Sequence, residues 1–222
     1  MRRDVSLEEI SDGKLYESGD MVKADCQDCI GCSDCCRGMG DSVVLDPYDL
    51  YRLSGGLGEA PSQVIDKYLE LGVVDGNILP HLKMTGKDQH CVFLNAEGRC
   101  SVHPLRPGFC RLFPLGRYYQ ENGFKYILQI YECSKKNRSK IKVKKWLDTP
   151  DLKQYEKYIA DWHAFLLDVQ EVLYEAQDED LIRNLNVYVV NRFFLKPYDG
   201  SRDFYEEFYE RLKEGRELLA LA

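Results

Sequence analysis

The segment Cys26-Gln-Asp-Cys29-Ile-Gly-Cys32-Ser-Asp-Cys35-Cys36 decides how this chain of 222 residues is interpreted. It holds five of the nine cysteines, and the other four, Cys91, Cys100, Cys110 and Cys133, follow in one later stretch. Thiols at such short spacings are typical of sites for a soft metal ion or an iron–sulfur cluster. A fold that joins the two groups would bring eight or nine thiols into one region.

The composition fits a globular protein with a buried core, with 44% hydrophobic and 30% charged residues. The net charge of −7 argues against non-specific nucleic-acid binding. The amino-terminal sequence MRRDVSLEEISDG has no apolar stretch behind its arginines, and no apolar run in the chain is long enough to cross a bilayer. We therefore expect a cytoplasmic protein with no nucleic-acid or membrane partner. Its cysteines should stay reduced and bind metal, and their odd number also disfavours disulfides.

Local signals predict several short elements in the first two thirds of the chain. Asp46-Pro47 predicts a helix start, Ser54-Gly55-Gly56 predicts its end, and Pro61 opens a second short helix. Residues 117–131, with the turn Glu121-Asn122-Gly123, have the pattern of a β-hairpin. We expect residues 1–25 to form a partly ordered polar lead-in.

The last third of the chain has the apolar periodicity of helices, at 151–177, 180–196 and 202–220. Thr149-Pro150 marks the start of the first of them. We expect an α+β fold class, with an irregular, metal-stapled cysteine-rich domain of short strands and helices over residues 1–148. Residues 149–222 should form a helical carboxy-terminal segment packed on that domain.

A basic run precedes this helical segment. It consists of Lys135, Lys136, Arg138, Lys140, Lys142, Lys144 and Lys145. Because such runs are usually solvated, we interpret it as a linker or a helix face rather than as a docking patch.

The spacing of the first cysteine group suits an iron–sulfur cluster. The run with gaps of two, two and three residues that bacterial ferredoxins use is matched by Cys26, Cys29, Cys32 and Cys36. Zinc also accepts thiolates from Cys-x2-Cys pairs. We expect the neighbours Cys35 and Cys36 to point in different directions, which argues against a single zinc knuckle. An iron–sulfur cluster is therefore the preferred cofactor, with zinc as the alternative.

Several cysteine motifs together resemble a known family over about residues 26–133. They are Cys29-x2-Cys32-x2-Cys35-Cys36, Cys91-Val-Phe-Leu, Cys100-Ser-Val-His and Arg106-Pro-Gly-Phe-Cys110-Arg-Leu-Phe-Pro114. This pattern is similar to the CxxCxxCC or YkgJ-type cysteine-cluster family, whose members are described as zinc- or iron-chelating proteins. The resemblance implies that eight cysteines act together as ligands: Cys29, Cys32, Cys35, Cys36, Cys91, Cys100, Cys110 and Cys133. Cys26 lies outside the family motif and is either an extra ligand or a spare thiol.

Two functions from different classes follow. The first is a redox, metal-handling or partner-binding module without a catalytic pocket of its own. The second is an enzyme, because the family also includes flagellin lysine N-methylases, which use S-adenosylmethionine. The carboxy-terminal helices show no corresponding motif, so no catalytic or cofactor-binding residue is assigned and the question of an enzyme stays open.

Side chains near the cysteines have two interpretations each. Arg106 and Arg111 either donate hydrogen bonds to thiolates and offset their charge, or form ordinary ion pairs and aromatic stacks. His90 and His103 could each replace a thiolate in a zinc site, although eight cysteines already supply two full ligand sets.

Overall fold

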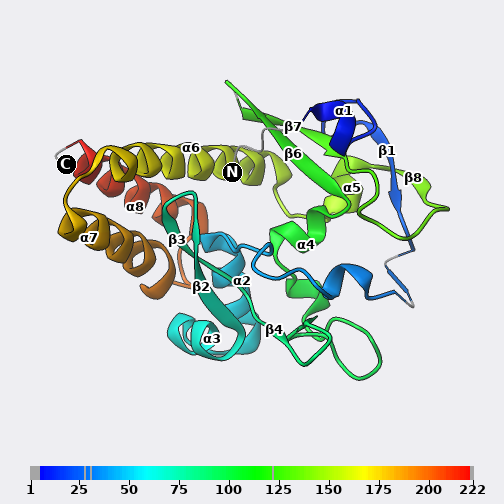
Figure 1. The fold of residues 1–222 in the computed structure, drawn as a ribbon, viewed down its shortest axis with the longest axis horizontal. Helices are drawn as coiled ribbons and strands as arrows, with labels where there is room; N and C mark the ends of the chain where they lie inside the picture. Colours follow the sequence, from blue (N-terminus) through cyan, green and yellow to red (C-terminus); the bar gives the residue numbers. More distant parts are fainter. Residues whose placement is uncertain (1–5, 28, 31, 122, 221–222) are drawn as a thin grey trace. The chain divides into compact units, whose positions relative to one another are not determined.

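The computed structural model describes residues 6–27, 29–30, 32–121 and 123–220 of the chain (Figure 1). The described chain contains helices and short antiparallel strand pairs, and its carboxy-terminal region is helical. The predicted α+β fold class is therefore confirmed.

The chain groups into two compact units, each built from two stretches of sequence. The first unit consists of residues 1–40 and 84–160, and the second of residues 41–83 and 161–222. The division expected between residues 148 and 149 stays a prediction.

The first unit consists of short elements joined by turns. In chain order they are α1 (Leu7–Ile10), β1 (Met21–Asp25), the 3-10 turn η1 (Asp34–Cys36), β4 (Met84–Thr85), β5 (His90–Cys91), η2 (His103–Leu105), α4 (Gly108–Leu112), β6 (Leu115–Gln120), β7 (Gly123–Leu128), β8 (Ser139–Lys142), α5 (Val143–Leu147) and the start of α6 (Leu152–Glu175). The pairs β1–β8, β4–β5 and β6–β7 are separate two-stranded sheets. The arrangement of these small sheets within the unit therefore depends on the loops that connect them.

The core of the first unit lies against its longest hairpin. The hairpin predicted within residues 117–131 is confirmed as β6 and β7. The buried residues of the core cluster are Val22, Ala24, Cys26, Leu112, Leu115, Tyr126, Leu128, Val143, Trp146 and Leu147. Trp146 Nε1 donates to the carbonyl oxygens of Leu112 at 3.3 Å and Phe113 at 3.2 Å. Trp146 thus ties α5 to α4, the helix that carries Cys110.

Two segments contain a strand that the sequence did not predict. The described part of the lead-in contains α1 and β1, with Val22 and Ala24 buried, which fits the expected partly ordered segment. The basic run contains β8, which pairs antiparallel with β1 through Met21 and Lys142, and then enters α5. The pairing was not predicted because it depends on distant neighbours, which a local pattern does not reveal.

The second unit is mainly helical. It contains α2 (Pro47–Leu57), α3 (Pro61–Tyr68), β2 (Leu69–Val74), β3 (Asn77–Leu82), the rest of α6, α7 (Glu179–Val189), the π-helical turn η3 (Val190–Leu195) and α8 (Phe204–Leu219). Both helices predicted from a proline at their first position, α2 and α3, are confirmed. Among the described residues, no helix is long and apolar enough to span a membrane.

In helix α2, the local sequence signals predicted the start correctly but not the end. The Asp46 side chain caps the helix by accepting from Asp49 N, and Pro47 follows as predicted. The expected stop at Ser54-Gly55-Gly56 was wrong, because the helix continues to Leu57. It ends at Gly58, whose φ of +67° lies in the left-handed region that glycine favours.

Helix α6 begins at Leu152, one residue after the start of the expected range 151–177. One face of its second half is buried at helical spacing, through Trp162, Phe165, Val169 and Leu173. The ring centroids of Trp162 and Phe165 lie 5.0 and 5.2 Å from that of Phe193. An aromatic core therefore stabilises the second unit.

Candidate metal centre

All nine cysteines belong to the first unit, and all are free thiols. The first group lies on consecutive tight turns. Cys32 N donates to Cys29 O at 3.0 Å, and Cys36 N donates to Ser33 O at 2.9 Å. Cys29 itself has a φ of +57°, an uncommon left-handed conformation for a residue other than glycine. The backbone thus reverses repeatedly within the segment that carries five thiols.

The second group is held by three different local structures. Cys91 ends β5 and pairs with Met84 of β4. Cys100 forms an antiparallel bridge with Leu94, and Cys110 lies in α4. Hydrogen bonds therefore fix the backbone at each of these three cysteines, and none of the three lies in a free loop.

The two groups meet at one small cavity of ≈ 50 Å³. Its lining residues are Cys29, Cys32, Cys35, Gly98, Arg99, Cys100, His103, Arg106, Cys110, Phe113 and Trp146. Five thiols thus converge, three from the first group and two from the second. Apart from Gly98, the rest of the lining consists of two arginines and the rings of His103, Phe113 and Trp146.

Three further thiols lie next to this set. The Cys26 and Cys29 sulfurs are 3.4 Å apart. Cys36 is hydrogen-bonded to Cys35, and the Cys91 thiol is close enough to Cys36 and Cys100 for their charges to affect its pKa.

Cys133 is placed only indirectly. It is half-buried, and the hydroxyl of the next residue, Ser134, lies 3.9 Å from the Cys32 sulfur. The chain at Cys133 therefore passes beside the first cysteine group, whereas no direct contact between its sulfur and the other thiols is described.

The expectation that Cys35 and Cys36 point apart was wrong. Their thiols are hydrogen-bonded to each other. The two residues belong to the 3-10 turn η1, in which successive residues differ by about 120° around the axis, rather than by the half-turn of a strand. Neighbouring sulfurs can therefore approach one another, and their adjacency does not exclude a shared metal ion.

The donor chemistry fits a soft metal, although the thiols are not closed around one. Among the described residues, no three His, Cys, Asp or Glu side chains are arranged to hold an ion as they stand. Five thiols nevertheless face one cavity, and thiolates are the ligands that zinc and iron–sulfur clusters share. The residues present therefore fit either group by chemistry and by location.

The thiols differ strongly in their readiness to ionise. Burial raises the pKa of Cys29 to about 12 and that of Cys91 to about 11. The hydrogen bond that Cys35 donates to Cys36 lowers the pKa of Cys36 to about 7, and the guanidinium groups of Arg37 and Arg106 act in the same direction. Because metals bind thiolates, occupation of this site should release protons.

The sequence allowed two interpretations for Arg106 and for Arg111, and the structure gives these two residues different surroundings. Arg106 lines the cavity, and its Nη1 lies 2.9 Å from His103 Nε2. Its charge favours the thiolate form of Cys29, Cys36 and Cys100, because it lowers the pKa of each. Arg111 is 3% exposed and lies over the Tyr155 ring at 5.5 Å. Arg106 thus can offset thiolate charge, whereas Arg111 stacks in the core.

A side-chain clamp connects the two cysteine groups. Arg37, next to Cys36, forms an ion pair with Asp88, and the other Asp88 oxygen accepts from His90 Nδ1 at 2.7 Å. His90 directly precedes Cys91. The same segments are joined through their backbones, since Gly38 N donates to Gln89 O at 2.8 Å. Asp88 therefore holds the chain at Cys36 beside the chain at Cys91.

We predict that Asp88→Asn weakens metal retention more than it weakens the fold. The amide cannot pair with Arg37 as a carboxylate does, so the two ligand segments lose their common anchor. Loss of metal to a competing chelator should become roughly 10-fold faster, the scale seen when outer partners of metal ligands are removed. The measurement is the rate of metal transfer to a coloured chelator.

The matched control is Asp180→Asn, which removes a similarly exposed partner of Arg183 in the second unit. It should leave the transfer rate unchanged. Equal rates for Asp88→Asn and wild type would contradict a positioning role for Asp88.

Sequence reasoning missed several residues of this site. Arg99, Phe113 and Trp146 line the cavity, and Asp88 joins its two sides. His103 was considered as a ligand, and it does face the cavity, where it interacts with Arg106. Arg99, His103 and Phe113 lie within three residues of Cys100 or Cys110, whereas Asp88 and Trp146 belong to no cysteine motif, so no local signal could have identified these two.

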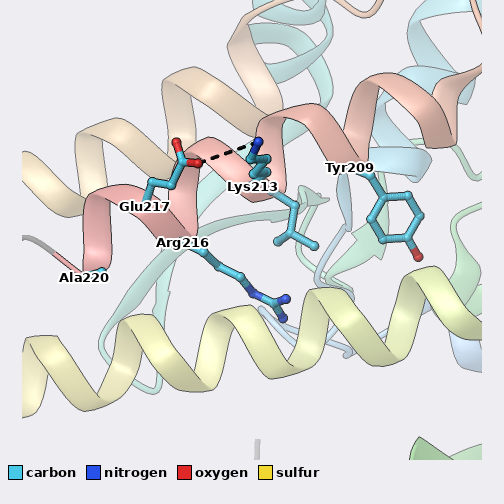
Figure 2. Close-up of a pocket in the computed structure, with 6 residues that line it drawn as sticks. Tyr209, Lys213, Arg216, Glu217 and Ala220 are labelled. Carbon is cyan, nitrogen blue, oxygen red and sulfur yellow. Dashed lines mark ion pairs between the residues drawn. The ribbon is translucent and has the colours of Figure 1, made fainter.

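A larger hollow of ≈ 460 Å³ lies in the second unit along α8 (Figure 2). Tyr209, Lys213, Arg216 and Glu217 are among the residues that line it, and Arg216 extends toward α6. Arg216 Nε lies 4.0 Å from Asp168, and Lys213 Nζ lies 3.9 Å from Glu217. The hollow contains no thiol, so it is separate from the cysteine site.

The first unit has the features of a cysteine-rich metal-chelating domain. Thiols from two chain segments line one cavity, and the unit consists of short elements joined by turns. Residues 28–149 match the CxxCxxCC family, whose description is "Putative zinc- or iron-chelating domain". Because this match covers more than half of the 222 residues, the chain belongs to that family. The comparisons with curated proteins and with solved structures found no match.

Proposed function

We propose that the first unit ligates an iron–sulfur cluster, with zinc as the second possible occupant, through both cysteine groups. The proposed ligands are Cys29, Cys32, Cys35, Cys36, Cys91, Cys100, Cys110 and Cys133, with Cys26 as an additional donor. The observation that carries the proposal is the cavity at which five of these thiols meet.

Eight thiols lie at or beside this cavity, more than the four that one zinc ion or one iron–sulfur cluster takes, so their number does not separate the two occupants. The ferredoxin-like spacing favours a cluster, and Cys26 of that run lies 3.4 Å from Cys29. Because the thiols of Cys35 and Cys36 lie close together, their adjacency does not argue against zinc. The preference for a cluster therefore rests on the spacing.

The surrounding side chains would adapt the site to a negatively charged centre. Arg106 reduces the electrostatic cost of gathering thiolates, while Phe113 and Trp146 limit the access of water. An iron–sulfur cluster would supply one-electron transfer, and zinc would stabilise the fold. We propose that the chain acts in the cytoplasm, where thiols stay reduced, as a redox, metal-handling or partner-binding module.

Anaerobic purification followed by absorption spectroscopy and elemental analysis tests this proposal. We expect iron and acid-labile sulfide, with a broad visible absorption that a reductant bleaches. A colourless protein with stoichiometric zinc would overturn the iron–sulfur assignment but keep the site. A protein without metal, in which all nine thiols react freely, would overturn both.

The methylase alternative predicts binding of S-adenosylmethionine. Pockets for ligands of that size usually have volumes of about 300–1,000 Å³. The cavity at the thiols, with ≈ 50 Å³, is too small, whereas the hollow along α8, with ≈ 460 Å³, is within this range. Calorimetric titration of S-adenosylmethionine into the metal-loaded protein decides the question, and heat of dilution alone would exclude the methylase. Saturable binding would instead favour the enzyme.

A further inference from the structure

The basic run presents exposed lysines before β8, in β8 and in α5 of the first unit. In β8, Ile141 packs against the core cluster while its neighbours Lys140 and Lys142 are exposed, as alternation along a strand requires. In α5, Trp146 and Leu147 are buried. We define the basic face as the five exposed cations Lys136, Lys140, Lys142, Lys144 and Lys145.

Among the described residues, these cations have no partner. In the part of the chain that the structure describes, none of the five ammonium groups forms an ion pair or a hydrogen bond. Elsewhere in the same unit, by contrast, Lys125 pairs with Glu17 at 2.5 Å. Residues 134–147 contain no acidic residue, although the whole chain has a net charge of −7, and Asp25 of the paired strand lies opposite Ser139. The positive potential of the basic face is therefore available to a partner.

The basic face lies next to the proposed metal site. Strands β1 and β8 run side by side, and β1 leads directly into Cys26 (Figure 1). Lys135 Nζ donates to the carbonyl oxygen of Ile30 at 3.5 Å, in the turns between Cys29 and Cys32. Ser134 lies 3.9 Å from the Cys32 sulfur. A partner on this face would therefore also touch the cysteine loop.

Two large apolar side chains are exposed in the same segments. Tyr131 is 95% exposed and Ile30 is 68% exposed. Each lies close in sequence to proposed ligands, Tyr131 to Cys133 and Ile30 to Cys29 and Cys32. Apolar anchors surrounded by charged groups are typical of protein interfaces, in which the charges steer association and the apolar groups contribute contact area.

We propose that the basic face, together with Ile30 and Tyr131, is a docking surface for an acidic segment of another protein. The sequence alone favoured a solvated run, but the structure gives that run a fixed face beside the cysteine loop. Charge complementarity selects the acidic partner, and the apolar pair favours a protein over a nucleic acid. The purpose of this docking surface rests on the proposed function, since docking here would bring a partner to the metal centre.

The probe for this proposal is a synthetic peptide rich in Glu, Asp and Phe, added to the full-length metal-loaded protein. We expect amide chemical shifts to change in β8, in α5 and around Ile30 and Tyr131, and affinity to fall as salt increases. The charge-reversed variant Lys140→Glu/Lys142→Glu/Lys144→Glu should bind the peptide at least roughly 10-fold more weakly. A DNA oligonucleotide of equal net charge serves as the competing probe.

The matched control reverses three exposed lysines elsewhere, as Lys14→Glu/Lys153→Glu/Lys213→Glu. It has the same net charge as the test variant and should bind the peptide like the wild type. Equal weakening in both variants, no shift on the basic face, or DNA binding as tight as peptide binding would each overturn the proposal. Metal content is measured in every sample, so a failed metal site is distinguished from failed docking.

Discussion

Replacement of Cys110 by serine is expected to remove bound metal and to lower the free energy of unfolding by about 4 kcal/mol or more, the range reached when a structural metal is lost. Cys110 lies in α4 and faces the cavity between the two cysteine groups. A serine hydroxyl is a poor ligand for soft metals, so the two groups lose a shared connection. Metal analysis and thermal melting of the purified variant measure the two effects.

The matched control is Leu112→Ala on the same helix. Leu112 is 5% exposed and belongs to the core cluster rather than to the cavity lining. Its truncation should cost about 2–5 kcal/mol through the space it leaves, yet the variant should keep its metal. Full metal content and unchanged melting of Cys110→Ser would exclude Cys110 from the ligand set.

Removal of the metal from the wild-type protein is expected to have an even larger effect. Binding of structural zinc is worth about 10–16 kcal/mol in small domains that depend on it. The sheets in the described part of the first unit are all two-stranded, so its turns need an additional constraint. We expect a strong chelator to lower the melting temperature markedly. Amide protection should be lost around Cys32 and Cys36, whose N–H groups donate within those turns.

The second unit supplies an internal reference for this experiment. Its aromatic core, around Trp162, Phe165 and Phe193, contains no thiol. Amides of α7 and α8 should therefore keep more protection than those of the cysteine turns. Reconstitution with metal should restore protection at Cys32 and Cys36. Identical melting and exchange before and after chelation would show that the fold does not depend on metal.

Elements with local signals were predictable from the sequence. The start of α2 follows from Asp46 and Pro47, because capping and a fixed proline φ act within one turn. The pairing of β1 with β8 was not predictable. It joins Met21 to Lys142, and the choice of such a partner depends on how the whole unit packs.

The candidate site was predictable in its ligand types but not in its geometry. The cysteine spacing indicated soft-metal ligands, and five of those thiols do meet at one cavity. The contact between Cys35 and Cys36 was mispredicted, because a 3-10 turn brings neighbouring side chains closer than the expected arrangement. The clamp through Asp88 could not be predicted from the sequence, since Arg37 and Asp88 are 51 residues apart.

X-ray absorption spectroscopy of the metal in the anaerobically purified protein tests the central claim most directly. The claim is that thiolates from both cysteine groups hold one metal centre. The account predicts a first coordination shell of sulfur, at about 2.3 Å for zinc. It also predicts that Cys32→Ser and Cys110→Ser, one from each group, both alter that shell. A shell of nitrogen and oxygen, or a sulfur shell that is unchanged in both variants, would contradict it.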